Sequence, residues 1–241
     1  MIRTFIFFDL ETTGLITKNC MPKVTELSLI AVSRTAVCNT KDFLPRVLQK
    51  LILPIHPNLN ISKEIETLTG LSNENLCEIQ HFNCDVYNLI INFINRQKAP
   101  TCFVAYNGNN FDYPILLSEL KTIDKSFSEN ILSIDMLQLI KDFFLREEPI
   151  KKMNNQINNS CNIEDRKRSI NARRKLDFTN SQPINFKLTN VYKHILGAEP
   201  ENAHSAEGDC LIMIRCAIQL GNFFVDWADS NAIPLINHIS K

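Results

Sequence analysis

The chain has 241 residues, and its 26 Lys and Arg are balanced by 26 Asp and Glu, so the formal net charge is zero. This balance excludes a uniformly basic protein that binds polyanions over its whole surface. A hydrophobic content of 44% with 22% charged residues is typical of a globular protein. The length suits one large α/β domain, and we expect residues 1–241 to form a single domain.

Charge is distributed unevenly along the chain. Residues 151–175 hold eight Lys and Arg against Glu164 and Asp165, a net charge of +6, so the rest of the chain carries −6. The wider stretch 149–182 is rich in Asn, Lys and Arg, which predicts a flexible basic insertion. Its cations suit contacts with phosphates or a nuclear address, and a solvated charged loop explains them equally well.

The eight cysteines form no CxxC pair, and most lie in apolar surroundings. We expect free core thiols in a reducing compartment, ahead of disulfides or a zinc site. The apolar stretch after Arg3 stops at Asp9, which is too short for a signal peptide, and nothing approaches the roughly 18 apolar residues of a membrane span. A protein of the cytoplasm or nucleus, with no membrane contact, is expected.

Apolar runs predict three strands near the start of the chain, at 3–10, 24–33 and 46–54. Their close spacing favours an antiparallel meander. A short helix closed by a glycine is expected over 62–70.

The rest of the chain alternates between strand and helix patterns. The elements expected in order are a helix over 82–96, a strand over 101–106, a helix with Pro114 in its first turn, a strand over 131–134 and a helix over 136–145. Beyond the insertion, helices are predicted over 187–196, 205–220 and 222–228. This order predicts an α/β fold, a mixed five-stranded sheet covered by helices on both faces.

Asp9 and Glu11 lie two residues apart at the end of the first strand, so both carboxylates point to the same face. The ends of strands are where open α/β sheets bind ligands. Two such neighbouring charges repel unless a cation or a proton lies between them. A strand end that turns polar as it meets solvent is the plainer alternative.

Three further polar residues follow predicted elements. Asp112 comes after a strand and a turn, where a helix N-terminus alone would explain it. Asp209 lies near the start of an apolar helix, a position that the helix dipole favours for any carboxylate. His204 precedes Asp209 by five residues, which places it on the segment leading into the helix. An exposed loop histidine without a role is the alternative.

Taken together, these residues predict chemistry that none indicates alone. Carboxylate oxygens suit Mg²⁺ or Mn²⁺ rather than zinc. Two such ions about 3.5–4 Å apart activate water and stabilise the leaving oxygen of a phosphodiester. A neutral histidine near pH 7 accepts the proton of that water. We therefore expect two ions, held by Asp9, Glu11, Asp112 and Asp209, with His204 as the base.

At these residues the chain resembles the DEDDh 3′→5′ exonucleases, and within them the three-prime repair exonucleases. The strings that carry the resemblance are FDLETTGL (8–15), PKVTEL (22–27), LTGLS (68–72), AYNGNNFDYPIL (105–116) and HSAEGD (204–209). The resemblance spans roughly residues 3–220. In combination these strings are highly specific, whereas the first alone indicates only the superfamily.

The resemblance implies a role for each matching residue. Asp9 would bridge both metals, Glu11 and Asp209 would complete the metal site that activates water, and Asp112 would hold the second metal. His204 would be the general base. The residues implied to contact the substrate are Thr12, Leu15, Leu68, Phe111 and Lys141, with Asp135 matching an acid near that lysine.

The resemblance also implies an RNase H-like α/β/α layered fold and a homodimer joined along the third strand, 46–54. The implied partners are single-stranded DNA or frayed 3′ ends of duplex DNA. Asn110 stands where relatives place an arginine beside the substrate, so DNA affinity is expected to differ. The basic insertion is longer than in those relatives, and we expect neither the proline-rich insertion nor the membrane-anchoring tail of some relatives.

The sequence thus predicts a metal-dependent 3′→5′ exodeoxyribonuclease that releases nucleoside 5′-monophosphates. An RNA 3′ exonuclease of the same superfamily remains an alternative, because nothing in the motifs senses a 2′-hydroxyl decisively. A catalytically silent nucleic-acid-binding protein is the third hypothesis. All five catalytic groups are present, which argues against it.

Overall fold

The computed structural model describes residues 1–40, 44–144 and 182–238. The segment 149–181, which holds nearly all of the predicted basic insertion, lies outside the described residues. The described part forms a six-stranded sheet in the order β3-β2-β1-β4-β5-β6. The strands are β1 (Thr4–Thr12), β2 (Val24–Ser33), β3 (Val47–Pro54), β4 (Thr101–Ala105), β5 (Leu132–Asp135) and β6 (Ile233–Pro234).

The sheet is mixed. β1, β2 and β3 form the predicted antiparallel meander, with Phe7 of β1 opposite Ile30 of β2 and Leu29 opposite Leu51 of β3. β4 and β5 pair in parallel with their neighbours β1 and β4. β1 has no partner in β4 beyond Phe7, so its last residues project past β4. This projection creates the corner at which Asp9 and Glu11 lie.

The prediction of five strands was wrong, because β6 adds a sixth at the edge beside β5. β6 has two residues, one of them Pro234, and pairs only with Leu132 and Ser133. Two residues are too few to show the alternation that identifies a strand, and proline is tolerated only at such an edge.

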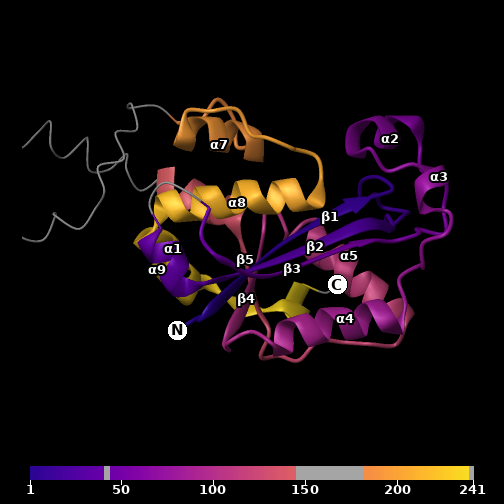
Figure 1. Ribbon diagram of the computed structural model, residues 1–241, viewed down its shortest axis with the longest axis horizontal. Coiled ribbons are helices and arrows are strands. Elements are labelled where there is room, and N and C mark those ends of the chain that lie inside the picture. Colours follow the sequence, from indigo (N-terminus) through magenta and orange to yellow (C-terminus); the bar gives the residue numbers. More distant parts are fainter. Residues whose placement is uncertain (41–43, 145–181, 239–241) are drawn as a thin grey trace, which may run out of the picture.

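Helices cover both faces of the sheet, as predicted (Figure 1). One face packs on α8 (Ala206–Leu220), with α7 (Leu188–Leu196) outside it and α1 (Arg34–Asn39) and α9 (Asn222–Asn231) beside it. The other face packs on α4 (Cys84–Asn95), α5 (Asp112–Thr122) and the 3₁₀ turn η1 (Leu235–His238). Residues 136–144 are also helical.

The hydrophobic core divides between these two faces. Phe5 and Phe7 of β1 pack with α8 and α9, while Ile6 and Phe8 pack with α4 and α5. This strict alternation is what a strand buried on both sides requires. It also fixes the direction of the next two odd-numbered residues, Asp9 and Glu11.

Two short helices, α2 (Lys63–Thr69) and α3 (Asn73–Leu76), stand apart from both layers, near the end of the sheet where β1 stops (Figure 1). α2 begins at its cap Ser62 and ends at Gly70, whose φ of 74° is the left-handed conformation that glycine adopts easily. The predicted helix over 62–70 is therefore confirmed. α1, α3 and η1 were not predicted.

The seven cysteines in the described ranges are all free, as expected, but only Cys102, Cys210 and Cys216 are core thiols, and the expectation of a core position was wrong for the other four. Cys161 lies outside those ranges. Among the described helices, no single one has the length and apolarity to cross a membrane. α8 and α9 meet that test only together, and they join at a bend of 105°.

Candidate active site

Asp9 and Glu11 point to the α8 face of the sheet. Both follow the odd-numbered alternation of Phe5 and Phe7, whose side chains pack against α8 and α9. Because β1 continues past β4 here, both carboxylates are half-buried rather than enclosed in the core. The predicted shared face is confirmed.

Helix α8 brings Asp209 to the same place. Ser205 caps the helix by accepting a hydrogen bond from the Gly208 N–H at 3.1 Å, which puts Asp209 in the first turn. Oxygen atoms of Asp9, Glu11 and Asp209 all lie within 4.8 Å of one another. Three carboxylates from residues 9, 11 and 209 therefore converge, although some 200 residues separate them in sequence.

Asp112 reaches the corner from the other side. It is the first residue of α5, only 3% exposed, and its Oδ1 accepts a hydrogen bond from the Leu10 N–H at 3.2 Å. Since β4 has no residue opposite Leu10, the Asp112 side chain bonds a strand amide that would otherwise lack a partner. This bond places the fourth carboxylate beside the residue that separates Asp9 from Glu11.

The turn before Asp112 is held by Asp135, at the end of β5. Its Oδ1 accepts from the Asn107 N–H at 2.9 Å, and its Oδ2 accepts from the Asn109 N–H at 3.3 Å. Asp135 is buried, which is consistent with its bracing the chain from within. The side chain of Asn110 is exposed and donates to Asn107 Oδ1 at 2.9 Å.

His204 lies on the exposed segment leading into α8, as predicted, and has a φ of 68°. This segment approaches α8 closely, since a Cβ at Gly208 would lie 1.8 Å from the Asn202 carbonyl oxygen. Only glycine fits there. Ser205 Oγ also donates to the Asn202 carbonyl at 3.1 Å, which closes the turn that carries the histidine.

Glu26 of β2 is a fifth carboxylate at this corner. It lies opposite Glu11 in the strand register, and its Oε2 accepts from the N–H of Ala206, the first residue of α8, at 2.9 Å. An anion at a helix N-terminus is favourable, because it bonds the free amides and meets the positive end of the dipole. Glu207 adds a second link through its 2.6 Å ion pair with Lys50 of β3.

Burial raises the pKa of all four carboxyl groups, and repulsion from other carboxylates raises it further for Asp9, Glu11 and Asp112. Burial and then the charges of Asp112 and Asp209 hold the pKa of Asp9 well above its usual value. Burial, followed by the charges of Asp209 and Glu26, raises the pKa of Glu11 to about 7, and burial raises that of Asp112 to about 8. Burial also raises the pKa of Asp209, where His204 acts in the opposite direction.

This arrangement fits divalent cations. Burial and other carboxylates raise the pKa of Asp9 and of Glu11, and no Lys or Arg in the described ranges lowers either pKa. Oxygen ligands of this kind are those that Mg²⁺ and Mn²⁺ prefer. The corner is therefore suited to bind divalent metal.

Comparison with known proteins gives close agreement over nearly the whole chain, although no family model matches. Mouse three prime repair exonuclease 2 is 30% identical over 95% of this chain and 88% of its own length. Human three-prime repair exonuclease 1 is 30% identical over 97% of this chain and 68% of its own length. The chain belongs to the three-prime repair exonuclease family.

Solved structures agree on the fold. The nuclease domain of 3′hExo, a DEDDh family member bound to rAMP, superposes with a TM-score of 0.62 over 91% of this chain and 92% of its own, at 12% identity. An E. coli ExoI–ssDNA complex gives a TM-score of 0.64 at 16% identity over 95% of this chain, which spans 43% of that longer protein. The fold is thus the DEDDh exonuclease fold that the resemblance implied.

Family membership makes this chain a 3′→5′ exonuclease whose substrates are nucleic acids. The side chains expected to contact substrate differ in exposure. Thr12 is buried and donates to the Gly14 carbonyl at 2.7 Å, while Leu15 just beyond it is 77% exposed. Phe111 is half-buried as the residue before α5, and Lys141 is half-buried on the helical segment 136–144.

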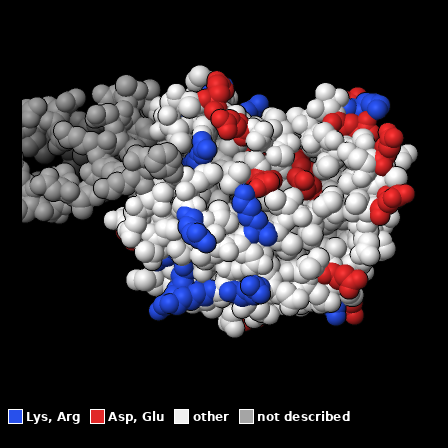
Figure 2. Space-filling view, in the orientation of Figure 1, with Lys and Arg blue, Asp and Glu red and all other residues white. Residues whose placement is uncertain are grey.

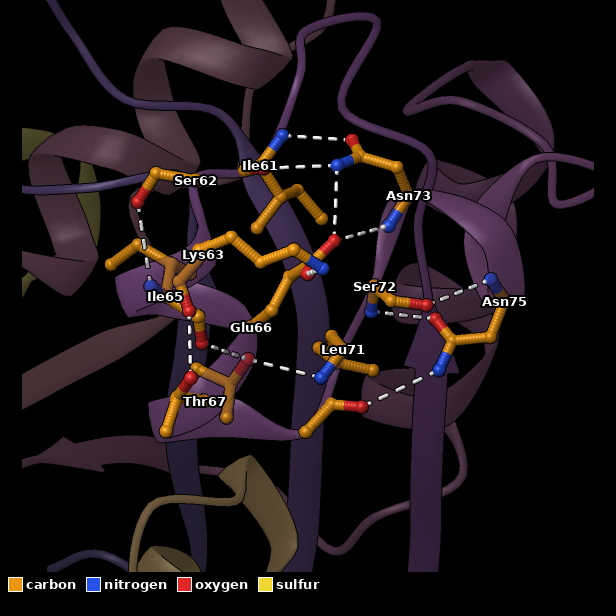
Figure 3. Close-up of polar contacts among 12 residues, drawn as sticks. Ile61, Ser62, Lys63, Ile65, Glu66, Thr67, Leu71, Ser72, Asn73 and Asn75 are labelled. Carbon is orange, nitrogen blue, oxygen red and sulfur yellow. Dashed lines mark hydrogen bonds and ion pairs between the residues drawn. The ribbon is translucent and has the colours of Figure 1, made fainter.

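Leu68 is carried by α2 and is 51% exposed. The segments around α2 are tied by side-chain hydrogen bonds (Figure 3). Asn73 accepts from the Ile61 N–H at 2.8 Å and donates to the Ile61 carbonyl at 2.9 Å and to Glu66 at 3.1 Å. Leu15 and Leu68 are thus two leucines whose side chains are exposed in this exonuclease.

Sequence reasoning assigned no role to three residues that build the site. Glu26 lies within a matched string but has no chemistry-bearing neighbour in sequence, and only the strand register brings it opposite Glu11. Gly208 and Asp135 act through main-chain contacts that no side-chain pattern shows. Only the structure reveals them: Gly208 lies against the Asn202 carbonyl, and Asp135 accepts hydrogen bonds from the amides of Asn107 and Asn109.

Proposed function

We propose that this protein is a 3′→5′ exodeoxyribonuclease that hydrolyses the terminal phosphodiester of DNA and releases nucleoside 5′-monophosphates. The convergence of Asp9, Glu11 and Asp209 within 4.8 Å supports this proposal most directly, with Asp112 bonded beside them. The DNA substrate follows from the names of the relatives, which are repair exonucleases.

Two divalent ions, Mg²⁺ or Mn²⁺, are proposed to bind the corner. Asp9, Glu11 and Asp209 would hold one ion, and Asp9 and Asp112 the other. When bound, such a pair lowers the pKa of water and stabilises the charge of the leaving oxygen. The four carboxyl groups would release their protons as the ions bind, because their raised pKa values arise in part from their mutual repulsion.

His204 is proposed as the general base. The water oxygen forms a bond to phosphorus, its proton passes to the imidazole, and the bond from phosphorus to the 3′-oxygen of the preceding nucleotide breaks. The products are a 5′-monophosphate and a strand one nucleotide shorter whose 3′-oxygen takes a proton from solvent. The exposed position of His204 leaves its ring accessible to a bound strand end.

The remaining residues would position the strand. Leu15, Leu68 and Phe111 present apolar surface for stacking against the terminal bases, and stacking is tolerant of sequence. Thr12 would contact the terminal nucleotide through its main chain, and Lys141 would lie near the phosphate backbone. These assignments derive from the matching motifs.

A homodimer is also proposed, joined along β3. In the described sheet β3 is an edge strand, and its outer N–H and C=O groups are available to pair with a second copy. Sedimentation or light scattering should then give twice the chain mass of 27.7 kDa.

A cytoplasmic or nuclear location fits the free thiols in the described ranges.

Product analysis tests the proposed function. Single- and double-stranded DNA and a matched RNA, each labelled at the 5′ end, should be incubated with Mg²⁺. We expect DNA to shorten stepwise from its 3′ end with release of 5′-monophosphates, and Asp9→Asn to abolish this. Faster shortening of the RNA would establish the alternative substrate. No shortening of either strand would overturn the catalytic proposal.

A further inference from the structure

A cavity of about 750 Å³ lies at the end of β1 opposite the carboxylates. Its walls come from the first four residues of the chain, the end of β2 and start of α1 at 33–35, Leu48 and Gln49 of β3, and the segment 96–98 that follows α4. Its volume is in the range of sites that hold nucleotide-sized ligands.

The charge of this cavity is entirely positive. Arg3, Arg34, Arg96 and Lys98 line it, and no Asp or Glu does. Arg34 is held in place by a 2.8 Å ion pair with Asp229 and a 3.4 Å bond to the Ile2 carbonyl. Within the described ranges, no carboxylate lies at ion-pair distance from Arg3, Arg96 or Lys98.

A neutral amide braces the wall of the cavity. The Gln97 amide donates to Gln49 Oε1 at 2.9 Å and to the Phe93 carbonyl at 3.0 Å, which fixes the wall between α4 and β3. The guanidinium groups beside this wall are suited to recognise phosphate oxygens, because Arg donates in a fixed planar fork.

Figure 2 shows where this charge lies on one face of the molecule. Lys and Arg side chains gather toward the side where Figure 1 places the start of the chain, while acidic side chains lie toward α2 and α3 and, in a second group, near α7. A protein of zero net charge with a carboxylate-rich catalytic corner must hold a polyanion partly by cations elsewhere.

We propose that the basic cavity, lined by Arg3, Arg34, Arg96 and Lys98, binds phosphate groups of the nucleic-acid substrate away from the bond that is cleaved. This inference rests on the proposed function and adds a second contact to it. From Thr4 at the cavity to Asp9 the strand advances about 17 Å, at roughly 3.3 Å per residue. Stacked strands rise about 3.4 Å per nucleotide and an extended single strand covers roughly twice that, so the cavity lies at least about three phosphates beyond the one that is cleaved.

The length of the DNA strand can therefore distinguish binding at this cavity from binding at the catalytic corner. The variant is the triple change Arg3→Gln, Arg96→Gln and Lys98→Gln, which leaves the ion pair of Arg34 intact. The matched control removes three cations that do not line the cavity, by Lys121→Gln, Lys125→Gln and Lys187→Gln. Both variants lose three positive charges, and thermal unfolding and mass in solution show whether fold and assembly are kept.

Hydrolysis and fluorescence anisotropy should be measured with single-stranded DNA of 4 and of 20 nucleotides. For the 20-mer we expect the cavity variant to raise KM and Kd at least tenfold with kcat unchanged, and the control to change them less than threefold. The slope of log K against log salt should fall by about 2, at about 0.7 per lost phosphate contact. For the 4-mer, wild type and variant should agree.

Three outcomes would overturn the inference. Equal effects on both lengths, or equal effects of the cavity variant and the control, would show that the cavity does not contact the strand. Binding of dAMP that the variant abolishes, with 20-mer binding unchanged, would make the cavity a site for free nucleotides. Because anisotropy needs no turnover, it tests the cavity even if wild-type protein cleaves no DNA, a result that would overturn the proposed function alone. If the triple variant unfolds, Arg96→Gln with Lys98→Gln takes its place.

Discussion

At the scale of single residues, the corner gathers carboxyl groups whose mutual repulsion is relieved by a proton or by a bound cation. Asp9 and Glu11 share a face because of strand alternation, while Asp112 and Asp209 arrive from the first turns of two helices. Placing two of the carboxylates at helix N-termini lowers the cost of gathering them, since the dipoles favour negative charge. The repulsion that remains favours the binding of a divalent metal ion.

The raised pKa of Asp112 makes a prediction for the metal-free protein. An unfolded Asp has a pKa of about 3.9, whereas burial raises the pKa of folded Asp112 to about 8. Between these values the folded state holds a proton that the unfolded state has released, so wild-type stability falls as pH rises. Asp112→Asn keeps the acceptor for Leu10 without this penalty.

Thermal unfolding in EDTA from pH 5 to pH 8.5 measures this effect. The Tm of Asp112→Asn should exceed that of wild type by an amount that grows with pH to several degrees, at roughly 2–4 °C per kcal/mol. With Mg²⁺ present the order should reverse. A difference that stays constant across this range would refute the assignment of a buried, protonated Asp112.

Glu26 provides a second prediction at this scale. Its bond to the Ala206 N–H joins β2 to the helix that carries Asp209 and follows His204. Glu26→Ala removes the acceptor, and a charge-assisted bond of this kind contributes about 1.5–3 kcal/mol. We expect kcat to fall at least tenfold with KM nearly unchanged.

Glu26→Gln is the matched variant, because it retains an oxygen that accepts the same bond. It should recover most of the lost kcat and most of the lost stability, so it should unfold at a higher temperature than Glu26→Ala. Equal loss in the two variants would show that the charge of Glu26, and not its hydrogen bond, matters.

At the scale of elements, strong patterns were predictable and short elements were not. The strand 24–33 coincides with β2, and the other predicted strands differ from the observed ones by two residues or fewer at each end. These segments are long apolar runs whose burial decides their conformation. β6 has two residues and forms because β5 supplies its partner, while α3 has only four residues, too few to show a helical period.

The same distinction holds for the site. Asp9, Glu11, Asp112 and Asp209 were predictable, because the sequence shows both their acidic side chains and their places at the ends of strands and helices. Glu26 becomes a neighbour of Glu11 only through the register of β1 and β2. A register is set by side chains along both strands, so a single residue does not reveal it.

The α2–α3 unit makes a prediction at this scale. Asn73 ties Ile61 and Glu66 together, and these bonds hold the helix that carries Leu68 (Figure 3). Asn73→Ala should loosen α2, raise KM for single-stranded DNA about three- to tenfold and leave kcat within twofold. Amide hydrogen exchange should become faster over 63–69 and stay unchanged in α8.

Asn75→Ala is the control, since it leaves the bonds to Ile61 and Glu66 in place. It removes the capping bond from the Ser72 N–H at 2.8 Å and a longer bond to the Gly70 carbonyl at 3.4 Å. Its effect on exchange in α2 should be smaller. Unaltered exchange over 63–69 in Asn73→Ala would show that packing, rather than this hydrogen-bond network, holds α2.

At the scale of the whole molecule, the fold separates two kinds of charge. The sheet puts its carboxylate corner at one end of β1 and its basic cavity at the other, on a chain of zero net charge. A polyanionic substrate would meet cations where it is held and metal where it is cut. This separation also explains why overall composition alone gave no sign of a nucleic-acid enzyme.

The central claim is that the four carboxylates form one divalent metal centre around Asp9. Crystals of the protein grown with Mn²⁺ and a nucleoside 5′-monophosphate would test it most directly through the anomalous scattering of manganese. We predict two peaks about 3.5–4 Å apart, both in contact with Asp9, one also with Glu11 and Asp209 and the other with Asp112. Manganese bound elsewhere on the protein, with none at Asp9, would contradict this account.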